Sequence, residues 1–275
     1  MTGAGSSSAA RGVGYDVTVD WDRRLARELP FIERIFRETG EVRRIIDVGS
    51  GTGRHAIALV ERGFEVTGVD PGVEMLERAH ANAVAAGVDV RFVEAGFGQL
   101  ADLGLGEVDA VMCTGNALPH VDGIAGLEAA LRDFAAVIRP GGVLILHLLN
   151  HERLLAVRPR SLPLVLRESG GDTVAFFRLF DYDPSDAPER IWLEFVTTVK
   201  SASEARAGAG DLGWSVTANR SAHTVMPPSV LCEALERTGF GGFRVYGDHG
   251  GKEFESQADE SVIVTARRER RGARV

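Results

Sequence analysis

The chain has 275 residues, of which 44% are hydrophobic, so it can bury a substantial core and is not disordered throughout. Its formal charge is −8, with 39 acidic residues against 31 Lys and Arg, which argues against a broad phosphate-binding surface. A small-molecule partner fits this charge better than a nucleic acid does. No apolar stretch of the sequence approaches the ~20 residues of a membrane-spanning helix, so no membrane partner is expected.

The two cysteines, Cys113 and Cys232, lack the dense spacing of a disulfide framework or a zinc site. Reduced thiols in a cytoplasmic protein are therefore expected, and no metal site is expected. Residues 1–14 are rich in Gly, Ser and Ala and lack the apolar core of a signal peptide, so we expect a disordered leader. Residues 269–275 are expected to form a solvated basic tail.

The first half of the chain alternates between helix and strand. Residues 21–38 have a helical pattern, which Pro30 is expected to interrupt. Residues 43–48, RRIIDV, form the short β-branched run typical of a buried strand. Further on, helices are predicted at 53–62 and from Pro71 to about Ala86, and strands at 65–69 and 88–94.

The same alternation continues to about residue 150. A fourth strand at 108–113 precedes a helix with one apolar face, which Pro140 and two glycines are expected to stop. Residues 141–149, GGVLILHLL, supply a fifth strand. Strands that alternate with helices at this spacing indicate a doubly wound α/β fold, in which right-handed crossovers cover both faces of a parallel sheet.

Beyond residue 150 the pattern changes to aromatic and β-branched segments joined by turn-rich stretches. This change indicates an inserted antiparallel lid over residues 151–226. A helix at 229–238 and the strands FRVYGD and SVIVTARR then complete a seven-stranded sheet. The expected organisation is a Rossmann-like core with an N-terminal helix over 15–150, the lid, and completion of the core sheet over 227–268.

Residues 45–53, IIDVGSGTG, place three glycines on alternate positions where the first strand ends. Open parallel sheets bind ligands at this edge. Gly49, Gly51 and Gly53 would let the backbone turn sharply and approach a ligand that a Cβ would exclude. Asp70 ends the second strand, where a carboxylate can accept hydrogen bonds from the two hydroxyls of an adenosine ribose. The turn and the acid together predict a ligand that contains a nucleoside.

A dinucleotide site would require G-x-G-x-x-G, in which the third glycine allows close helix packing. Arg54 occupies that third position here, so a nicotinamide-dependent oxidoreductase is the less favoured alternative. The phosphate-binding pattern G-x-x-x-x-G-K-[ST] does not occur in the sequence.

The segments IIDVGSGTG and EVTGVD resemble the first two motifs of the class I S-adenosylmethionine-dependent methyltransferases, and the resemblance covers most of the chain. It implies a seven-stranded sheet whose last strand is antiparallel, with S-adenosylmethionine as the cofactor. By position, the glycine loop would hold the methionyl part of the cofactor and Asp70 would hold the ribose. The residues thus assigned to the cofactor are Asp47, Gly49, Gly51, Gly53, Asp70, Met75, Gly96, Phe97 and Thr114.

Contacts to the adenine are less closely defined by the resemblance. Val73 or Met75 would pack on the base. Relatives often carry an acid after the third strand that contacts the adenine amino group, but FVEAGFGQL has Gly96 there. The contact would then come from the backbone N–H of Phe97 or from Glu94.

A second segment, TGNALPHV at 114–121, resembles the LGNSxxHL segment of glycine N-methyltransferase-like small-molecule enzymes. The resemblance implies that Asn116 helps to define the methyl-transfer pocket and that His120 contacts the substrate, which makes these two residues the catalytic candidates. The glycine enzymes hold the substrate carboxylate with an arginine where this chain has Leu149, so a glycine-like acceptor is not implied. The substrate-binding candidates are Tyr15, Trp21, Asn150 and Tyr246.

The predicted function is transfer of a methyl group to a nitrogen or oxygen of a small molecule. A sulfonium methyl is already activated, so the protein has mainly to align the acceptor and exclude water. An amine must arrive unprotonated, and His120, His147 and His223 remain alternatives as a base. Tyr246, Asp248 and His249 follow the sixth strand as either cleft or turn residues. A non-catalytic cofactor-binding protein stays an alternative, and whether the chain forms a homodimer is left open.

Overall fold

The computed structural model describes residues 16–185, 188–200 and 214–270. Within them, residues 22–157 and 224–270 form one compact unit, and the remaining described residues form a second, smaller unit. The predicted leader, Tyr15 and most of the predicted basic tail lie outside the described residues. No helix in the described part of the chain has the length and apolar character of a membrane span.

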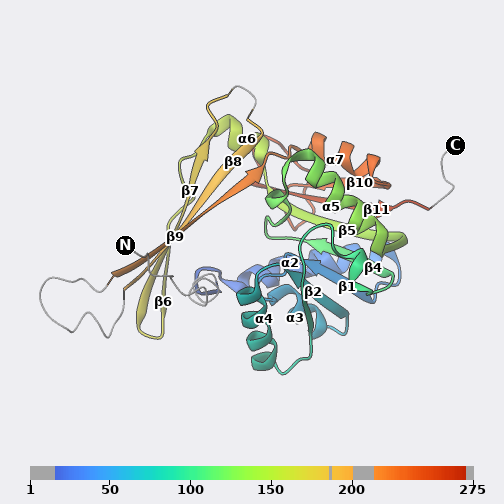
Figure 1. Cartoon of the computed structure of the whole chain (residues 1–275), viewed down its shortest axis with the longest axis horizontal. Coiled ribbons are helices and arrows are strands. Elements are labelled where there is room, and N and C mark those ends of the chain that lie inside the picture. The colour runs from blue at the N-terminus through green and yellow to red at the C-terminus, as the bar shows by residue number, and fades with distance from the viewer. Residues whose placement is uncertain (1–15, 186–187, 201–213, 271–275) are drawn as a thin grey trace, which may run out of the picture. The chain divides into compact units, whose positions relative to one another are not determined.

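A seven-stranded sheet organises the larger unit, in the order β10-β11-β5-β4-β1-β2-β3 (Figure 1). The neighbouring strands from β5 to β3 are parallel, whereas β11 is antiparallel to both β5 and β10. The predicted α/β sheet with an antiparallel final strand is therefore confirmed. The strands are β1 (Arg44–Val48), β2 (Glu65–Asp70), β3 (Arg91–Glu94), β4 (Val108–Cys113), β5 (Ile138–Leu149), β10 (Phe240–Tyr246) and β11 (Ser261–Arg268).

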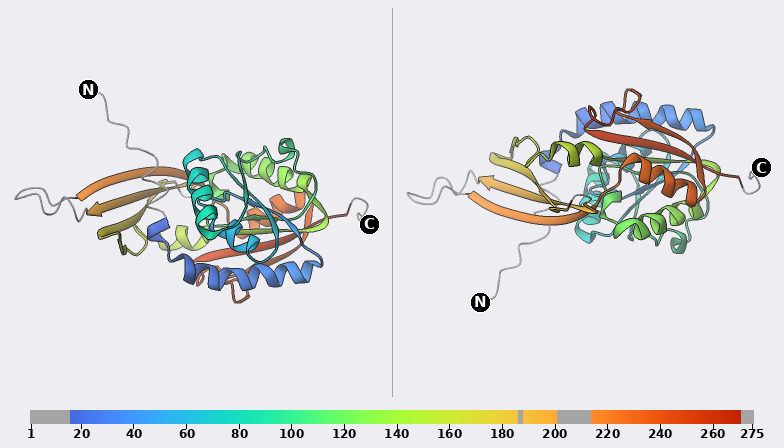
Figure 2. Two further views of the ribbon diagram at one scale, coloured as in Figure 1. Left: turned by 90° about the horizontal axis from the view of Figure 1, so that it is seen from below. Right: turned by 90° about the horizontal axis from the view of Figure 1, so that it is seen from above.

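Successive residues of the central strands contribute to cores on opposite faces of this sheet. In β5, Ile145 packs in the core that includes residues of α2 (Trp21–Thr39), α3 (Arg54–Val60) and α4 (Val73–Ala86). Leu144 and Leu146 pack in the other core, with residues of α5 (Gly123–Val137) and α7 (Pro228–Arg237). Figure 2 shows α2 along one side of this unit and α5 with α7 on the other. Alternation along the strands thus produces the two-faced sheet that the sequence predicted.

Two prolines lie inside regular elements, and for Pro30 this differs from the prediction. α2 continues through Pro30, whose neighbours Leu29 and Phe31 are each 2% exposed. Burial of this apolar face offsets the hydrogen bond that a proline removes from a helix. α5 ends at Val137, before Pro140 as predicted, but β5 begins at Ile138 and so includes Pro140, at a point where the register with β4 shifts. Such an irregularity accommodates a proline, because no regular ladder hydrogen bond is required there.

Two other helices differ from the prediction. α4 begins at Val73 and not at Pro71, because Gly72 caps the helix in an extended conformation. A short helix, α6 (His151–Val157), directly follows β5 and was not predicted. It groups with the larger unit by its contacts, and the domain boundaries proposed from the sequence stay a prediction.

The smaller unit contains a four-stranded sheet in the order β6-β7-β8-β9, with antiparallel pairing of β6 with β7 and of β7 with β8. The antiparallel region expected from the sequence is therefore present. β6 was not predicted, and its mostly exposed residues explain why it shows no clear apolar alternation. The strands are β6 (Val165–Ser169), β7 (Asp172–Tyr182), β8 (Arg190–Lys200) and β9 (Trp214–Thr224). The function of this sheet as a lid stays a prediction.

Candidate functional site

The loop between β1 and α3 has a left-handed backbone at three glycines, with φ of 69°, 54° and 76° at Gly49, Gly51 and Gly53. A Cβ on Gly49 would lie 2.5 Å from the Cβ of Ala117, and one on Gly53 would lie 2.6 Å from the ring of Phe92. A Cβ on Gly51 would meet no described atom within 4 Å. Gly49 and Gly53 are thus required for packing inside the protein, and Gly51 is the glycine that borders open space.

Asp70 joins this loop to the end of β2. Its Oδ2 accepts a hydrogen bond from the N–H of Gly51 at 2.8 Å, and its Oδ1 accepts one from the N–H of Gly72 at 2.9 Å. Burial raises the pKa of Asp70, and these two hydrogen bonds oppose the rise. Because each carboxylate oxygen has a second lone pair, Asp70 can hold the loop and still accept donors from a ligand.

Asp47 lies in β1 before the loop and is only 2% exposed. Its Oδ2 is buried and has no hydrogen-bond partner among the described residues. Burial raises the pKa of Asp47 to about 6; His55 and Arg24 oppose this rise, and Asp70 adds to it. A buried carboxylate oxygen without a donor is uncommon, so this atom is a candidate for contact with a ligand.

The segment after β4 lies against the glycine loop, because Ala117 occupies the space beside Gly49. Asn116 has a left-handed backbone with φ of 68°. Its side-chain Oδ1 accepts a hydrogen bond from the N–H of Leu149 at 2.9 Å, and its own N–H donates to the carbonyl of His147 at 3.0 Å. Asn116 therefore holds the end of β5 beside the loop.

Thr114 and His120 flank Asn116 in this segment. Thr114 is 9% exposed, and His120 ends the short helix η2 (Leu118–His120). Burial lowers the pKa of His120, and the nearby negative charge of Asp70 acts in the opposite direction. The fold therefore brings His120 into electrostatic range of Asp70.

The residues expected near an adenine lie where β3 ends. The N–H of Ala95 donates to the carbonyl of Asp70 at 3.3 Å, so this segment adjoins the end of β2. The N–H of Gly96 donates to the side-chain oxygen of Gln99 at 2.6 Å, and the ring of Phe97 packs against the core. Among the two helix candidates, Val73 is 50% exposed and Met75 is partly buried next to Gly72.

Asn150 is fully buried in this structure. Its Nδ2 donates to the carbonyls of Ser256 and Asp259 at 2.6 and 2.8 Å, and its Oδ1 accepts from the N–H of Arg153 at 3.2 Å. Both amide donors of Asn150 are thus engaged in holding the segment before β11. A contact between Asn150 and a substrate would require these hydrogen bonds to break.

Of the remaining candidates, Tyr246 belongs to the larger unit, and Trp21 and His223 belong to the smaller unit. Tyr246 ends β10 and packs edge-on against Phe31 of α2, with ring centroids 5.2 Å apart. The indole of Trp21 donates to Asp16 at 3.1 Å in the smaller unit. His223 is buried at the end of β9 with a ring nitrogen 3.1 Å from the hydroxyl of Ser221.

A buried charged cluster on α2 was not predicted. Glu28 is 1% exposed, accepts a hydrogen bond from Nε of Arg24 at 3.0 Å, and lies 2.7 Å from Nε2 of His55. Burial would raise the pKa of Glu28, but the hydrogen bond from His55 and the charge of Arg24 hold this pKa well below its usual range. One sequence signal was available: Glu28 falls on the apolar face of its helix, next to Leu29.

Comparison with known proteins gives a family match for the segment that contains the glycine loop. Residues 45–142 match a methyltransferase domain. A glycine/sarcosine N-methyltransferase of Parasynechococcus marenigrum is 38% identical over 141 residues, which are 51% of this chain and 50% of that protein. The chain thus spans about half the length of the curated relatives it matches.

Two solved structures are similar over nearly the whole chain. An S-adenosylmethionine-dependent methyltransferase from Clostridium acetobutylicum has a TM-score of 0.71, covering 92% of this chain and 93% of that chain at 14% identity. A sugar N-methyltransferase from Streptoalloteichus sp. has a TM-score of 0.70, covering 98% and 96% at 19% identity. At these identities the similarity shows a shared fold.

Proposed function

We propose that this chain is a class I S-adenosylmethionine-dependent methyltransferase and that it transfers a methyl group to a nitrogen of a small molecule. The glycine/sarcosine and sugar enzymes named above are N-methyltransferases, which favours nitrogen over oxygen as the acceptor atom. Because similarity to the curated relatives covers half of each chain, the activity is a proposal for this protein.

One observation carries the proposal: Gly51 borders open space, and its N–H donates a hydrogen bond to the carboxylate of Asp70. This arrangement fits the cofactor S-adenosylmethionine. The two hydroxyls of a ribose can donate hydrogen bonds to Asp70, and the backbone at Gly51 can approach the cofactor closely because it carries no Cβ. The buried oxygen of Asp47 fits the same ligand as an acceptor for a donor from its methionyl end. Met75, Gly96, Phe97 and Thr114 are proposed to complete the cofactor site.

When bound, the cofactor supplies a methyl group that its sulfonium already activates. The residues of this chain then have to hold the acceptor in line and exclude water. We propose that Asn116 and His120 border the acceptor, since both follow β4 close to the glycine loop. Burial lowers the pKa of His120, which favours the neutral imidazole that can accept a hydrogen bond or a proton from an amine.

Strand order opposes the nicotinamide alternative. Dinucleotide-binding folds have the order 3-2-1-4-5-6, whereas here the antiparallel β11 lies between β5 and β10. The position that such folds keep small for helix packing is Arg54, and the close packing occurs one residue earlier, at Gly53.

Several finer statements belong to the same proposal. We propose a small-molecule acceptor and no nucleic-acid partner because the net charge is −8, and a cytoplasmic location because both cysteines are unpaired. We also propose that residues 151–226 contribute to acceptor recognition, together with Tyr15, Trp21 and Tyr246. Assembly as a homodimer stays open.

The cofactor part of the proposal is tested by calorimetric titration with S-adenosylhomocysteine. Asp70→Ala is expected to weaken binding by about 1–3 kcal/mol, because a charged acceptor of hydrogen bonds is removed. Binding of NADH in place of S-adenosylhomocysteine would contradict the proposal, and unchanged affinity in Asp70→Ala would place the ribose elsewhere.

The transfer part is tested with a methyl-labelled cofactor and a panel of amino acids, primary amines and amino sugars. We expect label to move to at least one amine, with matching formation of S-adenosylhomocysteine. Cofactor binding without transfer to any member of the panel, or to an added panel of phenols and carboxylates, would favour the non-catalytic alternative.

A further inference from the structure

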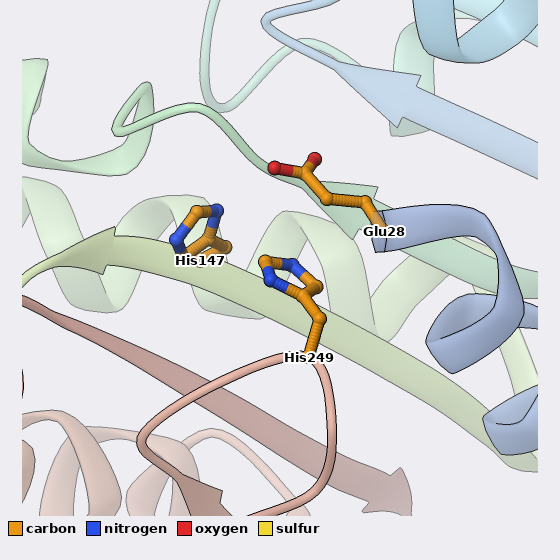
Figure 3. A group of neighbouring side chains, drawn as sticks. All are labelled: Glu28, His147 and His249. Carbon is orange, nitrogen blue, oxygen red and sulfur yellow. The ribbon is translucent and has the colours of Figure 1, made fainter. Parts of the chain in front are cut away.

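Three side chains of metal-ligating type meet on the face of the sheet that α2 covers. Glu28 comes from α2, His147 from β5, and His249 from the loop after β10 (Figure 3). His147 lies two residues after Ile145 and so points to the same core as that residue. One ligand atom from each of the three side chains lies within 4.8 Å of the other two.

The imidazole of His147 has unused bonding capacity in this arrangement. Its Nδ1 is buried and has no hydrogen-bond partner in the described part of the chain. The rings of His147 and His249 meet edge to face, with centroids 4.9 Å apart. Buried polar atoms normally have a partner, and this one faces a second imidazole and a carboxylate.

The carboxylate of Glu28 is oriented by hydrogen bonds from neighbouring side chains, as metal-ligating carboxylates commonly are. Its two oxygens accept from Arg24 and His55, at 3.0 and 2.7 Å. Ligating carboxylates are commonly oriented by such outer hydrogen bonds, and each oxygen retains a lone pair for an ion. The neighbouring arginine charge disfavours any cation, so affinity would have to come from the imidazole nitrogens.

We propose that Glu28, His147 and His249 form a binding site for a divalent transition-metal ion of the zinc or cobalt type. Two imidazoles and one carboxylate suit such ions, whereas magnesium and calcium prefer sites made of oxygen atoms. Bonds of about 2.0–2.2 Å to one ion place any two ligand atoms no more than about 4.4 Å apart, so separations of up to 4.8 Å need at most a small movement. His249 can supply that movement because Gly247, Gly250 and Gly251 surround it in the loop. The site is independent of the proposed methyl transfer.

The experiment uses the full chain without a polyhistidine tag, in a Cys232→Ser background that removes the partly exposed thiol. Cobalt(II) is titrated while its visible d–d absorption is followed, and zinc(II) is titrated by calorimetry. We expect one ion per chain in both titrations and no binding of magnesium. His249→Phe keeps a ring against Phe31 and removes both nitrogens, so at least a tenfold loss of cobalt and zinc affinity is expected.

The matched control is His80→Phe, which removes an exposed imidazole that packs on Phe92 of β3. Its affinity for both ions should equal that of the parent. Glu28→Gln is a second test variant, used only if its unfolding curve shows a folded protein, and it should also lose at least tenfold. Absence of binding, unchanged affinity in His249→Phe, or an equal loss in His80→Phe would each overturn the proposal.

Discussion

Two polar sites in the larger unit are built in opposite ways. The glycine loop and Asp70 lie inside residues 45–142, which match the methyltransferase domain, and backbone hydrogen bonds join them. Glu28, His147 and His249 all lie outside that segment and approach one another through side chains of three separate elements. Local chain geometry determines the first site, whereas the second exists only when the fold has brought distant residues together.

The two sites also differ in the groups that stabilise their buried carboxylates. At the loop, the carboxylate of Asp70 accepts hydrogen bonds from two backbone donors, one of which is the N–H of Gly51, the glycine that borders open space. At Glu28, a charge that is almost completely buried depends on partners from other segments. Substitutions at the Glu28 cluster should therefore act first on stability, and substitutions at the loop should act on both stability and cofactor binding.

The largest effect is expected for Glu28→Ala. Removing one partner of a buried ion pair costs about 3–5 kcal/mol, because the charge of Arg24 loses its compensation and the imidazole of His55 loses its hydrogen-bond partner. Urea unfolding measures this loss. Arg27→Ala is the control, since that side chain is 64% exposed and its pair with Glu28 should contribute less than about 1 kcal/mol. A loss below about 1 kcal/mol in Glu28→Ala would mean that the cluster is well solvated.

Asp47→Asn tests the buried carboxylate of β1 through pH. The pKa of Asp47 rises from 3.8 to about 6 on burial, so the folded state binds this proton more tightly than the unfolded state does. Stability from this group is full below about pH 4 and is lost as pH rises to about 6, by up to about 3 kcal/mol. Asp47→Asn lacks this dependence.

Urea unfolding of both proteins at about pH 4 and pH 7 measures the Asp47 effect, because the other groups cancel in the difference. Relative to wild type, Asp47→Asn should gain stability on going from the lower to the higher pH. An equal response of the two proteins would show that the carboxylate of Asp47 has a partner in solution.

Gly53→Ala and Gly51→Ala separate packing from ligand approach within one loop. A Cβ on Gly53 would press on the ring of Phe92 as well as strain the backbone, so a loss of about 2–3 kcal/mol is expected. Gly51→Ala adds only the backbone strain, about 1 kcal/mol, but its Cβ occupies the open space beside the loop. Gly51→Ala should therefore lose more affinity for S-adenosylhomocysteine per unit of lost stability. Equal behaviour of the two variants would place the cofactor away from Gly51.

Sequence periodicity predicted most of the fold because each strand and helix carries its own local pattern. The β-branched run of β1 and the glycine turn after it are examples, and the alternation of such strands with helices predicted the parallel part of the sheet. The effect of Pro30 was misjudged because burial of its neighbours outweighed the local preference of proline, and the early start of β5 was missed because a register shift accommodates Pro140 within the strand. Tertiary packing decided these positions, and a single sequence does not display it.

The candidate site likewise has a part that the sequence predicted and a part that only the fold brings together. Gly51 and Asp70 lie 19 residues apart, and their motif spacing was enough to place them together. Gly49 packs on Ala117, and these two residues come together only because the sheet places β1 beside β4. Glu28, His147 and His249 are still further apart in the chain. Because these three residues are distant in the chain, no spacing of metal-ligating residues in the sequence indicated a metal site.

The last prediction concerns Asn116, which is hydrogen-bonded to the backbone of β5. Asn116→Ala removes the acceptor of the Leu149 N–H and leaves an alanine at φ of 68°, so a stability loss of about 1–2 kcal/mol is expected. Asn116→Asp keeps an oxygen acceptor and tolerates this backbone conformation, so it should recover most of the lost stability. Turnover of the methyl acceptor then separates two roles. If Asp restores stability but not kcat, the amide NH2 of Asn116 acts on the acceptor. If Asp restores both, Asn116 acts only by positioning the end of β5, and its assignment as a catalytic residue is wrong.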